Sequence, residues 1–481
     1  MKTVKIGGGC LKGHDIISNI VDLIIKRGRG DVFVLSALHG VTDKLLDGIQ
    51  RALSNEDEIP AIVNGLKEEH YTLLRSLVSD SNGGAAGDLN SLDQEHFNRV
   101  KQELERLFLK IERYYFGINF TREVTPRMHD IIVSYGERLS VILMAGVLKS
   151  RGENAGYIMP QDAGVITDGR FGDATANMPL TSENFKKNVI PLMLPANSIQ
   201  TSDTHLQTSD KILFFPGFFG ISESGEITTF GRGGSDYSAA VVAAALKADI
   251  LEIWKDTEGF MSADPNDVPD AKLIPVLSYE EASELAYSGA NILHPRTVEP
   301  VRKSGINIAI KNTLNPDGPG SLITEFAVQS DNVVKSISHT KDIAVLKVYA
   351  SGVGLRQGIL ARIAGTISDA GINIKSVITS QTCISLLLSR KDIDRAHAVI
   401  TNMKPRLYRE SEQVTDNALI SVVGDGLHNH RGIAAKCFTA VSEADVNIEM
   451  ISYGPSRAAL YFLVQEQDIG KTLKALHSYF V

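Results

Sequence analysis

Four stretches of the N-terminal two thirds combine glycine, charge and hydroxyl groups in patterns that suit phosphate and carboxylate binding. The first, Lys5-Ile6-Gly7-Gly8-Gly9, stands where an apolar strand ends. Consecutive glycines let backbone N–H groups approach a phosphate closely, and Lys5 adds positive charge. Because a glycine-rich turn after a strand is more often only a tight turn, this stretch alone leaves both interpretations open.

The second stretch, Ser36 to Thr42, follows a second apolar strand and offers hydroxyl and amide groups. Open α/β sheets bind their ligands at the carboxyl ends of their strands, which is where we expect this stretch to lie. We interpret His39 within it as a loop residue and not as a catalyst.

The third stretch, Thr228 to Tyr237, leads into the helix-forming run Ser238 to Leu246. A helix begins with unpaired amides and a partial positive charge, so an anion is stabilised there, and Ser235 is a candidate cap. Arg232 can bind a carboxylate through two parallel hydrogen bonds. Asp236 suits either a role in the site or a simple first-turn position favoured by the helix dipole.

The fourth stretch, Glu252 to Asn266, is predicted as a strand followed by a loop that suits adenine and ribose contacts. Ser278 to Glu281 form a capping box at the start of the next helix, which is a structural motif. His294, just before a proline, is predicted to be a buried hydrogen-bonding residue.

The elements that must position these stretches alternate between short apolar strands and helices, which predicts a mostly parallel α/β sheet. Apolar residues recur at helical spacing between Gln94 and Phe116, so a long amphipathic helix is expected there. This helical insertion suits either a lid or a packing layer.

The C-terminal third contains a repeat with a period of 74 residues: Gly358 corresponds to Gly432, and Asn373 to Asn447. Each copy is predicted to contain a strand, a helix, a second strand and a hairpin. Such duplicated units resemble ACT domains, which bind amino acids at their paired interfaces. A purely structural dimerisation module is the alternative.

Length and composition limit the number of domains, the partners and the cellular location to be expected. The 481 residues imply two or three domains, and a net charge of −8 disfavours a nucleic-acid or anionic-membrane partner. Three widely separated cysteines do not form a disulfide framework, and neither a signal peptide nor a long apolar run is evident, so a cytoplasmic location is expected.

Three motifs occur in the order in which they occur in aspartokinases: Phe230 to Tyr237, Ile253 to Asp256, and Gly289 to Thr297. The chain therefore resembles the monofunctional members of that family, since its length leaves no room for a homoserine dehydrogenase after the repeats. The resemblance implies an amino-acid-kinase fold, a mostly parallel sheet sandwiched by helices, followed by two βαββαβ ACT domains. The implied boundaries are 1–325 for the catalytic domain, 340–415 for the first ACT domain, completed by 466–481, and 416–465 for the second.

The resemblance implies transfer of the γ-phosphate of ATP to L-aspartate, with Mg²⁺ as the metal, in the first step of lysine, threonine and methionine synthesis. A carboxylate nucleophile is already ionised at neutral pH, so catalysis reduces to alignment and charge neutralisation. The implied residues are Lys5 and Asp236 for catalysis; Gly7, Gly8, Gly9, Ser36, Gly233 and Gly234 for phosphate; Thr42, Glu137, Arg232 and Ser235 for substrate; and Lys255, Asp256, Met261, Asn266 and Asn291 for nucleotide.

The chain departs from the family at Gly9-Cys10, where threonine and serine are common. Asn266 and Asn291 stand where many members have basic residues, and Met261 where tyrosine is common. A catalytically weakened amino-acid sensor and a kinase for another small carboxylate are therefore the alternatives.

The resemblance also implies an amino-acid effector, lysine being preferred and threonine possible, and a homodimer or homotetramer formed through the ACT domains. The implied effector residues are Val353, Gln357, Gly358, Ile359, Asn373, Ile374 and Thr379.

Overall fold

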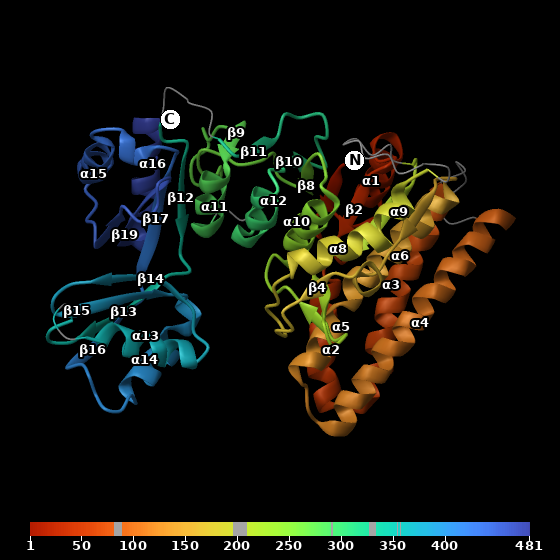
Figure 1. Cartoon of the computed structure of the whole chain (residues 1–481), viewed down its shortest axis with the longest axis horizontal. Helices are drawn as coiled ribbons and strands as arrows, with labels where there is room; N and C mark the ends of the chain where they lie inside the picture. The colour runs from red at the N-terminus through yellow and green to blue at the C-terminus, as the bar shows by residue number, and fades with distance from the viewer. Residues whose placement is uncertain (81–88, 196–208, 290–291, 327–332, 354, 356) are drawn as a thin grey trace. The chain divides into compact units, whose positions relative to one another are not determined.

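The computed structural model describes the chain except for residues 81–88, 196–208, 290–291, 327–332, 354 and 356. The chain forms two compact units (Figure 1). The first consists of Met1–Phe260 and Ile292–Phe326, and the second of Met261–Asn291 and Ala327–Val481.

The first unit is built on a mostly parallel sheet, as the alternation of strands and helices predicts. Its strands follow one another in the order β3 (Ala155–Tyr157), β5 (Ile212–Pro216), β2 (Val32–Leu35), β1 (Thr3–Ile6), β8 (Leu251–Lys255), β10 (Ile308–Asn312) and β11 (Ser321–Thr324). Only β11 runs antiparallel to its neighbour β10. A smaller sheet contains β4 (Ile166–Thr167), β6 (Phe219–Ser222) and β7 (Ile227–Thr229).

Helices cover both faces of this sheet, in keeping with the burial of β1, β2 and β5 along their whole length. One layer contains α1 (His14–Arg27), α2 (Val41–Ser54), α3 (Ile59–Ser79), α4 (Ser91–Thr121), α5 (Pro126–Val133) and α6 (Tyr135–Ser150). The remaining helices of the unit are α7 (Pro160–Ala163), α8 (Met178–Asn188), α9 (Ile190–Met193), α10 (Gly234–Leu246) and α12 (Val298–Lys303).

The long amphipathic helix predicted over Gln94–Phe116 is confirmed as α4. Its apolar residues, including Leu104, Phe108 and Tyr115, are buried in the main core against α2, α3 and α6. Of the two interpretations of this insertion, the structure supports the packing layer and not the lid.

One stretch, Pro126–Ser150, is long and apolar enough by composition to cross a membrane. It comprises α5 and α6, and 94% of its most apolar window is buried inside the first unit. These two helices therefore belong to the core of the first unit.

The second unit contains the two repeats, each with a four-stranded antiparallel sheet. The first repeat has strand order β14 (Ile374–Thr379), β15 (Cys383–Leu388), β13 (Ala344–Tyr349) and β16 (Glu410–Val414), with α13 (Ile359–Asp369) and α14 (Ile393–Thr401). The second has β12 (Ser336–Thr340), β17 (Asn417–Val423), β19 (Ala459–Gln465) and β18 (Met450–Tyr453), with α15 (Ile433–Glu443) and α16 (Ile469–Phe480).

The prediction that residues 466–481 complete the first repeat is wrong. The apolar side of α16, with Ile469, Leu473 and Leu476, lies in the core of the second repeat beside Phe462. The fourth strand of that repeat is β12, which precedes the first repeat in the chain and pairs with β17. The second repeat is therefore assembled from both sides of the first.

The predicted catalytic domain of 1–325 also needs a correction, because residues 261–291 belong to the second unit. This segment carries β9 (Val276–Ser278) and α11 (Tyr279–Tyr287). Ala263 and Val268 pack in the core of the second repeat, and Lys335 Nζ lies 2.9 Å from the fully buried Glu281 carboxylate. Apolar burial and a buried ion pair thus fix the segment there.

Replacing Leu473 by alanine tests this assignment. The side chain is almost fully buried, so the cavity should destabilise the second repeat by about 2–5 kcal/mol. Hydrogen exchange should accelerate in β12, β17 and β19 and stay unchanged in β13 and β15. Leu360→Ala, at a half-exposed position of α13, is the control, and acceleration in β13 and β15 by Leu473→Ala would contradict the assignment.

Candidate active site

The carboxyl ends of β1 and β2 meet the start of α10 around a cavity of about 420 Å³. Two helices, α2 and α10, begin at this cavity, so their unpaired amides favour an anion. The predicted residues that line it are Lys5, Gly8, Gly9, Ser36, Thr42, Glu137, Arg232, Gly233, Gly234, Ser235 and Asp236. Residues of three of the four stretches thus line one cavity, and Lys255 of the fourth stretch lies beside it in contact with Asp236.

A buried carboxylate, Asp236, lies between two ammonium groups. Lys5 Nζ is 2.6 Å from one of its oxygens, and Lys255 Nζ is 3.4 Å from the other. Burial alone would raise the pKa of Asp236, but the two lysines outweigh it and lower the pKa below its ordinary value. Burial lowers the pKa of Lys255 in turn. The centre of the site therefore holds a compact cluster of paired charges.

Ser235 is not the helix cap that the sequence suggested. The N-cap of α10 is Gly233, which has a φ of 67° and leaves Ser235 in the first turn. A Cβ atom on Gly233 would lie 2.3 Å from the Cβ of His294, so both backbone conformation and space require glycine. The Ser235 hydroxyl instead donates to Glu137 at 3.4 Å.

Glu137 is a buried carboxyl of the cavity whose pKa is raised. It lies in the first turn of α6, and burial raises its pKa to about 8, against opposing backbone N–H groups of Glu137 itself and Ala37. The start of α6 lies close to the stretch Ser36 to Thr42, because a Cβ on Gly136 would be 2.7 Å from the Cβ of Ala37. With no substrate cation beside it, the Glu137 carboxyl is therefore largely protonated at neutral pH.

The glycine loop after β1 forms a tight turn beside this cluster. Cys10 N–H donates to the Gly7 carbonyl at 3.0 Å, and Leu11 N–H donates to the Gly8 carbonyl at 3.1 Å. A Cβ on Gly9 would lie 3.3 Å from the carboxylate of Asp256. Side chains here would crowd the backbone, which fits a cradle for phosphate oxygens.

Cys10 does not face this cradle. Its buried Sγ is 3.7 Å from the Trp254 carbonyl and accepts a hydrogen bond from Thr313 at 3.4 Å. Burial raises the pKa of the thiol, which makes it a poor nucleophile. The loss of a family hydroxyl at this position therefore removes no group from the cavity.

Several residues to which the sequence analysis gave no role hold the loops that lead to Arg232. The buried Asp130 carboxylate accepts N–H groups from Gly172 and Thr229, both at 2.8 Å. Arg296 lies 2.6 Å from Asp173, and its guanidinium also bonds the carbonyl of Phe230 at 3.2 Å. These contacts fix the backbone that leads to Arg232.

Phe218 also lines the cavity and has a φ of 76°, an unfavourable conformation for a residue with a side chain. No sequence pattern marked it or Asp130. Arg296 stands within the family motif but was assigned no role there.

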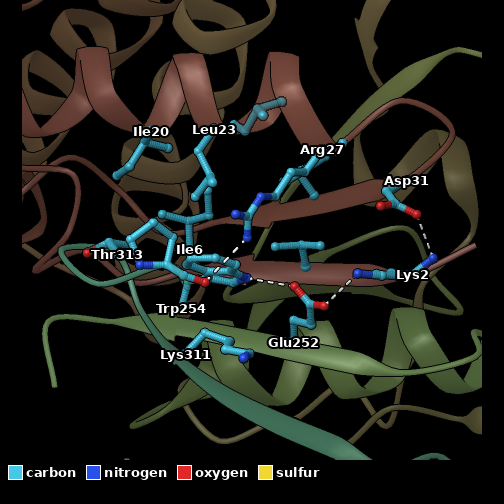
Figure 2. A pocket seen from close by; sticks show the side chains of 15 residues that line it. Lys2, Ile6, Ile20, Leu23, Arg27, Asp31, Glu252, Trp254, Lys311 and Thr313 are labelled. Carbon is cyan, nitrogen blue, oxygen red and sulfur yellow. Dashed lines mark hydrogen bonds and ion pairs between the residues drawn. The ribbon is translucent and has the colours of Figure 1, made fainter. Parts of the chain in front are cut away.

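A second cavity of the first unit, of about 210 Å³, lies between α1 and one face of the sheet (Figure 2). The Trp254 ring lies across it, and its Nε1–H donates to Glu252, which also binds Lys2 (Figure 2). Arg27 bonds the Pro316 carbonyl at 3.3 Å. Its charged side chains are thus engaged with groups of the chain itself, unlike Arg232, which is exposed on the other cavity.

The remaining predicted nucleotide residues are dispersed. Lys255 ends β8, and Asp256 follows it beside the glycine loop. Met261 and Asn266 belong to the second unit, where the Met261 carbonyl accepts a hydrogen bond from Ser336 at 2.8 Å. Asn291 lies outside the described residues.

The predicted effector residues all lie in the first repeat, around the start of α13 and along β14. Gly358 is the N-cap of α13, and Ile359 packs in the repeat's core. The Val353 N–H donates to the Gln381 carbonyl at 3.2 Å. Gln357, Asn373 and Thr379 are exposed, and Ile374 begins β14.

Comparison with known proteins identifies the family of this chain. The amino acid kinase family matches residues 2–312. The chain belongs to this family. An ACT domain matches residues 420–480 of the amino acid kinase, a range that includes α16 and agrees with the corrected second repeat.

Relatives of this amino acid kinase are aspartokinases. The aspartokinase of Candida albicans is 28% identical over 97% of this chain and 87% of its own length. The bifunctional aspartokinase/homoserine dehydrogenase of Haemophilus influenzae is 29% identical over 99% of this chain, which spans only 56% of that protein. The crystal structure of E. coli aspartokinase III with aspartate and ADP is 25% identical, covers 100% of this chain and 99% of its own, and has a TM-score of 0.80.

The raised pKa of Glu137 predicts how the stability of this kinase depends on pH. Its carboxyl titrates near 4.5 when unfolded and near 8 when folded, so the folded state binds more protons between these values and stability falls as pH rises through them. In Glu137→Gln, which cannot titrate, calorimetric melting temperatures should fall less across this window. The exposed Glu95→Gln is the control, and an unchanged pH slope in Glu137→Gln would refute the assignment.

Proposed function

We propose that this amino acid kinase is an aspartate kinase, which converts ATP and L-aspartate into ADP and 4-phospho-L-aspartate. The relatives support the reaction, since they are aspartokinases and one solved structure contains aspartate and ADP. The observation that carries the proposal is the Lys5–Asp236–Lys255 cluster beside the glycine loop, on a cavity that also presents Arg232 and Glu137.

Two side chains that line the cavity bind the substrate in this proposal. The exposed guanidinium of Arg232 binds the α-carboxylate of aspartate through two hydrogen bonds. Glu137 receives the ammonium group and ionises as it does so, because a cation beside a buried carboxyl lowers its pKa. Together these contacts leave the side-chain carboxylate of aspartate pointing toward the phosphate cradle.

The chemical step then needs no general base. An oxygen of the aspartate side chain, already ionised, forms a bond to the γ-phosphorus as the bond from that phosphorus to the β,γ-bridging oxygen breaks. ADP leaves with the electron pair of that bond. Lys5 neutralises the charge on the transferring phosphoryl group, and the glycine-loop amides hold the phosphates in line.

The residues present fit Mg²⁺, which we expect with ATP. Asp236 and Asp256 supply carboxylates near the cradle, although no group of three His, Cys, Asp or Glu in the described ranges is arranged to hold a metal ion. Phosphate oxygens and water would complete its coordination, as is usual for this ion, and the metal would neutralise phosphate charge.

Regulation by an amino acid at the first repeat is part of the proposal. A solved E. coli relative, 25% identical with a TM-score of 0.76, contains lysine and aspartate, which favours lysine over threonine as the effector. Val377 on β14 and Ile451 on β18 are exposed apolar residues on strands at sheet edges, which suits pairing of subunits into a homodimer or homotetramer. We also propose a cytoplasmic location and a role at the start of lysine and threonine synthesis.

Arg232→Ala tests the reaction and the substrate contact together. Loss of a two-bond contact to a carboxylate should cost about 2–4 kcal/mol, hence roughly 30- to 1,000-fold in kcat/KM for aspartate, with most of the effect in KM. Arg232→Lys should recover only part of it. The KM for ATP should change little.

The assay measures ADP release with ATP, Mg²⁺ and L-aspartate, and Arg170→Ala, at an exposed arginine, is the control. Turnover of another small carboxylate but not of aspartate would identify a different kinase. Absence of turnover on every carboxylate, with lysine or threonine still bound, would identify a sensor.

A further inference from the structure

A cavity of about 310 Å³ in the second unit lies where the sheets of both repeats meet α11. This volume is in the range of pockets that hold small molecules. Its lining comes from three places: Glu284 and Tyr287 of α11; Lys375, Ser376, Ile378 and Leu387 of the first repeat; and Leu419, Met450, Ser452, Pro455, Ser456, Tyr461, Phe462 and Leu463 of the second.

The cavity exists because small polar residues interrupt an apolar interface between the two sheets. Val345 and Leu387 of one sheet pack against Leu419 and Leu463 of the other. Ser376 is the cross-strand partner of Leu387, so it shares this inward face. Ser452 faces inward in the same way as the partner of Tyr461. The two serines leave unfilled the volume that larger side chains would occupy.

Helix α11 closes the cavity through specific contacts. The Tyr287 hydroxyl donates to the Lys375 carbonyl at 2.8 Å, and the Tyr461 hydroxyl donates to one carboxylate oxygen of Glu284. The Tyr287 and Tyr461 rings meet edge to face with centroids 6.2 Å apart. The position of α11 is therefore coupled to both sheets at this point.

Polar groups with remaining capacity surround the apolar wall. The second oxygen of Glu284 and the hydroxyls of Ser376 and Ser452 have no hydrogen-bond partner within the described part of the chain. Lys375 adds a cation, whose Nζ lies 3.0 Å from the Asp342 carboxylate and also donates to the Asp342 carbonyl, which leaves one of its three N–H groups for a ligand. One carboxylate, one ammonium group and an aliphatic wall together match a zwitterion with an apolar side chain.

We propose that this cavity binds an L-amino acid with an aliphatic side chain. Its ammonium group would bind the free oxygen of Glu284, its carboxylate Lys375, and its side chain would contact Leu387, Met450 and Leu463. Two expected effector residues, Ile374 and Thr379, lie on the same strand β14, but none of the expected effector residues lines this cavity.

The test is a calorimetric titration of the full chain with L-leucine, without ATP or aspartate, in saturating lysine and threonine. Leucine should bind at one site per chain. Glu284→Gln should weaken binding at least tenfold, and Ser452→Phe, which fills the cavity, should abolish it. Glu280→Gln, on the same helix but not lining the cavity, should bind leucine as the unchanged chain does.

Three results would overturn the proposal. One is absence of leucine binding to the unchanged chain. Another is unaltered affinity in both Glu284→Gln and Ser452→Phe, with cooperative melting of each variant confirmed. The third is leucine binding that lysine or threonine abolishes, because leucine would then occupy the expected effector positions. Since the measurement needs no turnover, its failure is separate from failure of the kinase assignment.

Discussion

The buried carboxylate of Asp236 lies between two opposite charges, those of Lys5 and Lys255. Removing a carboxylate from water costs several kcal/mol unless close cations compensate, and Lys5 and Lys255 provide that compensation from adjacent strands. The parallel pairing of β1 with β8 places Lys5 opposite Ile253, with Lys255 two residues further along β8 on the same face of the sheet, and the first turn of α10 delivers the carboxylate. Two glycines beside this cluster lie close to other side chains: a Cβ on Gly9 would lie 3.3 Å from the Asp256 carboxylate, and a Cβ on Gly233 would lie 2.3 Å from the Cβ of His294.

The same cluster explains why the site suits phosphoryl transfer to a carboxylate. Two ammonium groups, two helix N-termini and a glycine turn make a region that attracts anions, while Arg232 remains exposed and free to orient a substrate. Burial raises the pKa of Glu137 to about 8, and in the proposed mechanism a substrate ammonium group lowers it again. The cavity thus supplies alignment and charge and requires no proton transfer to the nucleophile.

Much of this arrangement could be predicted from the sequence, and the failures have physical causes. Strand periodicity and the glycine-rich stretches sufficed for the parallel sheet and most of the cavity, since these signals are local. The Ser235 cap was wrong because a left-handed Gly233 competes for the cap position, and local composition does not show which wins. The sequence did not show which repeat α16 and β12 join. The two repeats have similar sheets, which offer each of these elements a similar apolar surface. Asp130 and Phe218 act through contacts with segments distant in the chain and left no pattern.

We expect Lys5 and Asp236 to act as one unit in catalysis. A double-mutant cycle on kcat/KM with Lys5→Met and Asp236→Asn tests it most directly, with melting temperatures confirming that each variant is folded. If the two residues act together, the double variant should lose little more activity than the worse single variant. Losses that simply add, as for independent residues, would contradict the account.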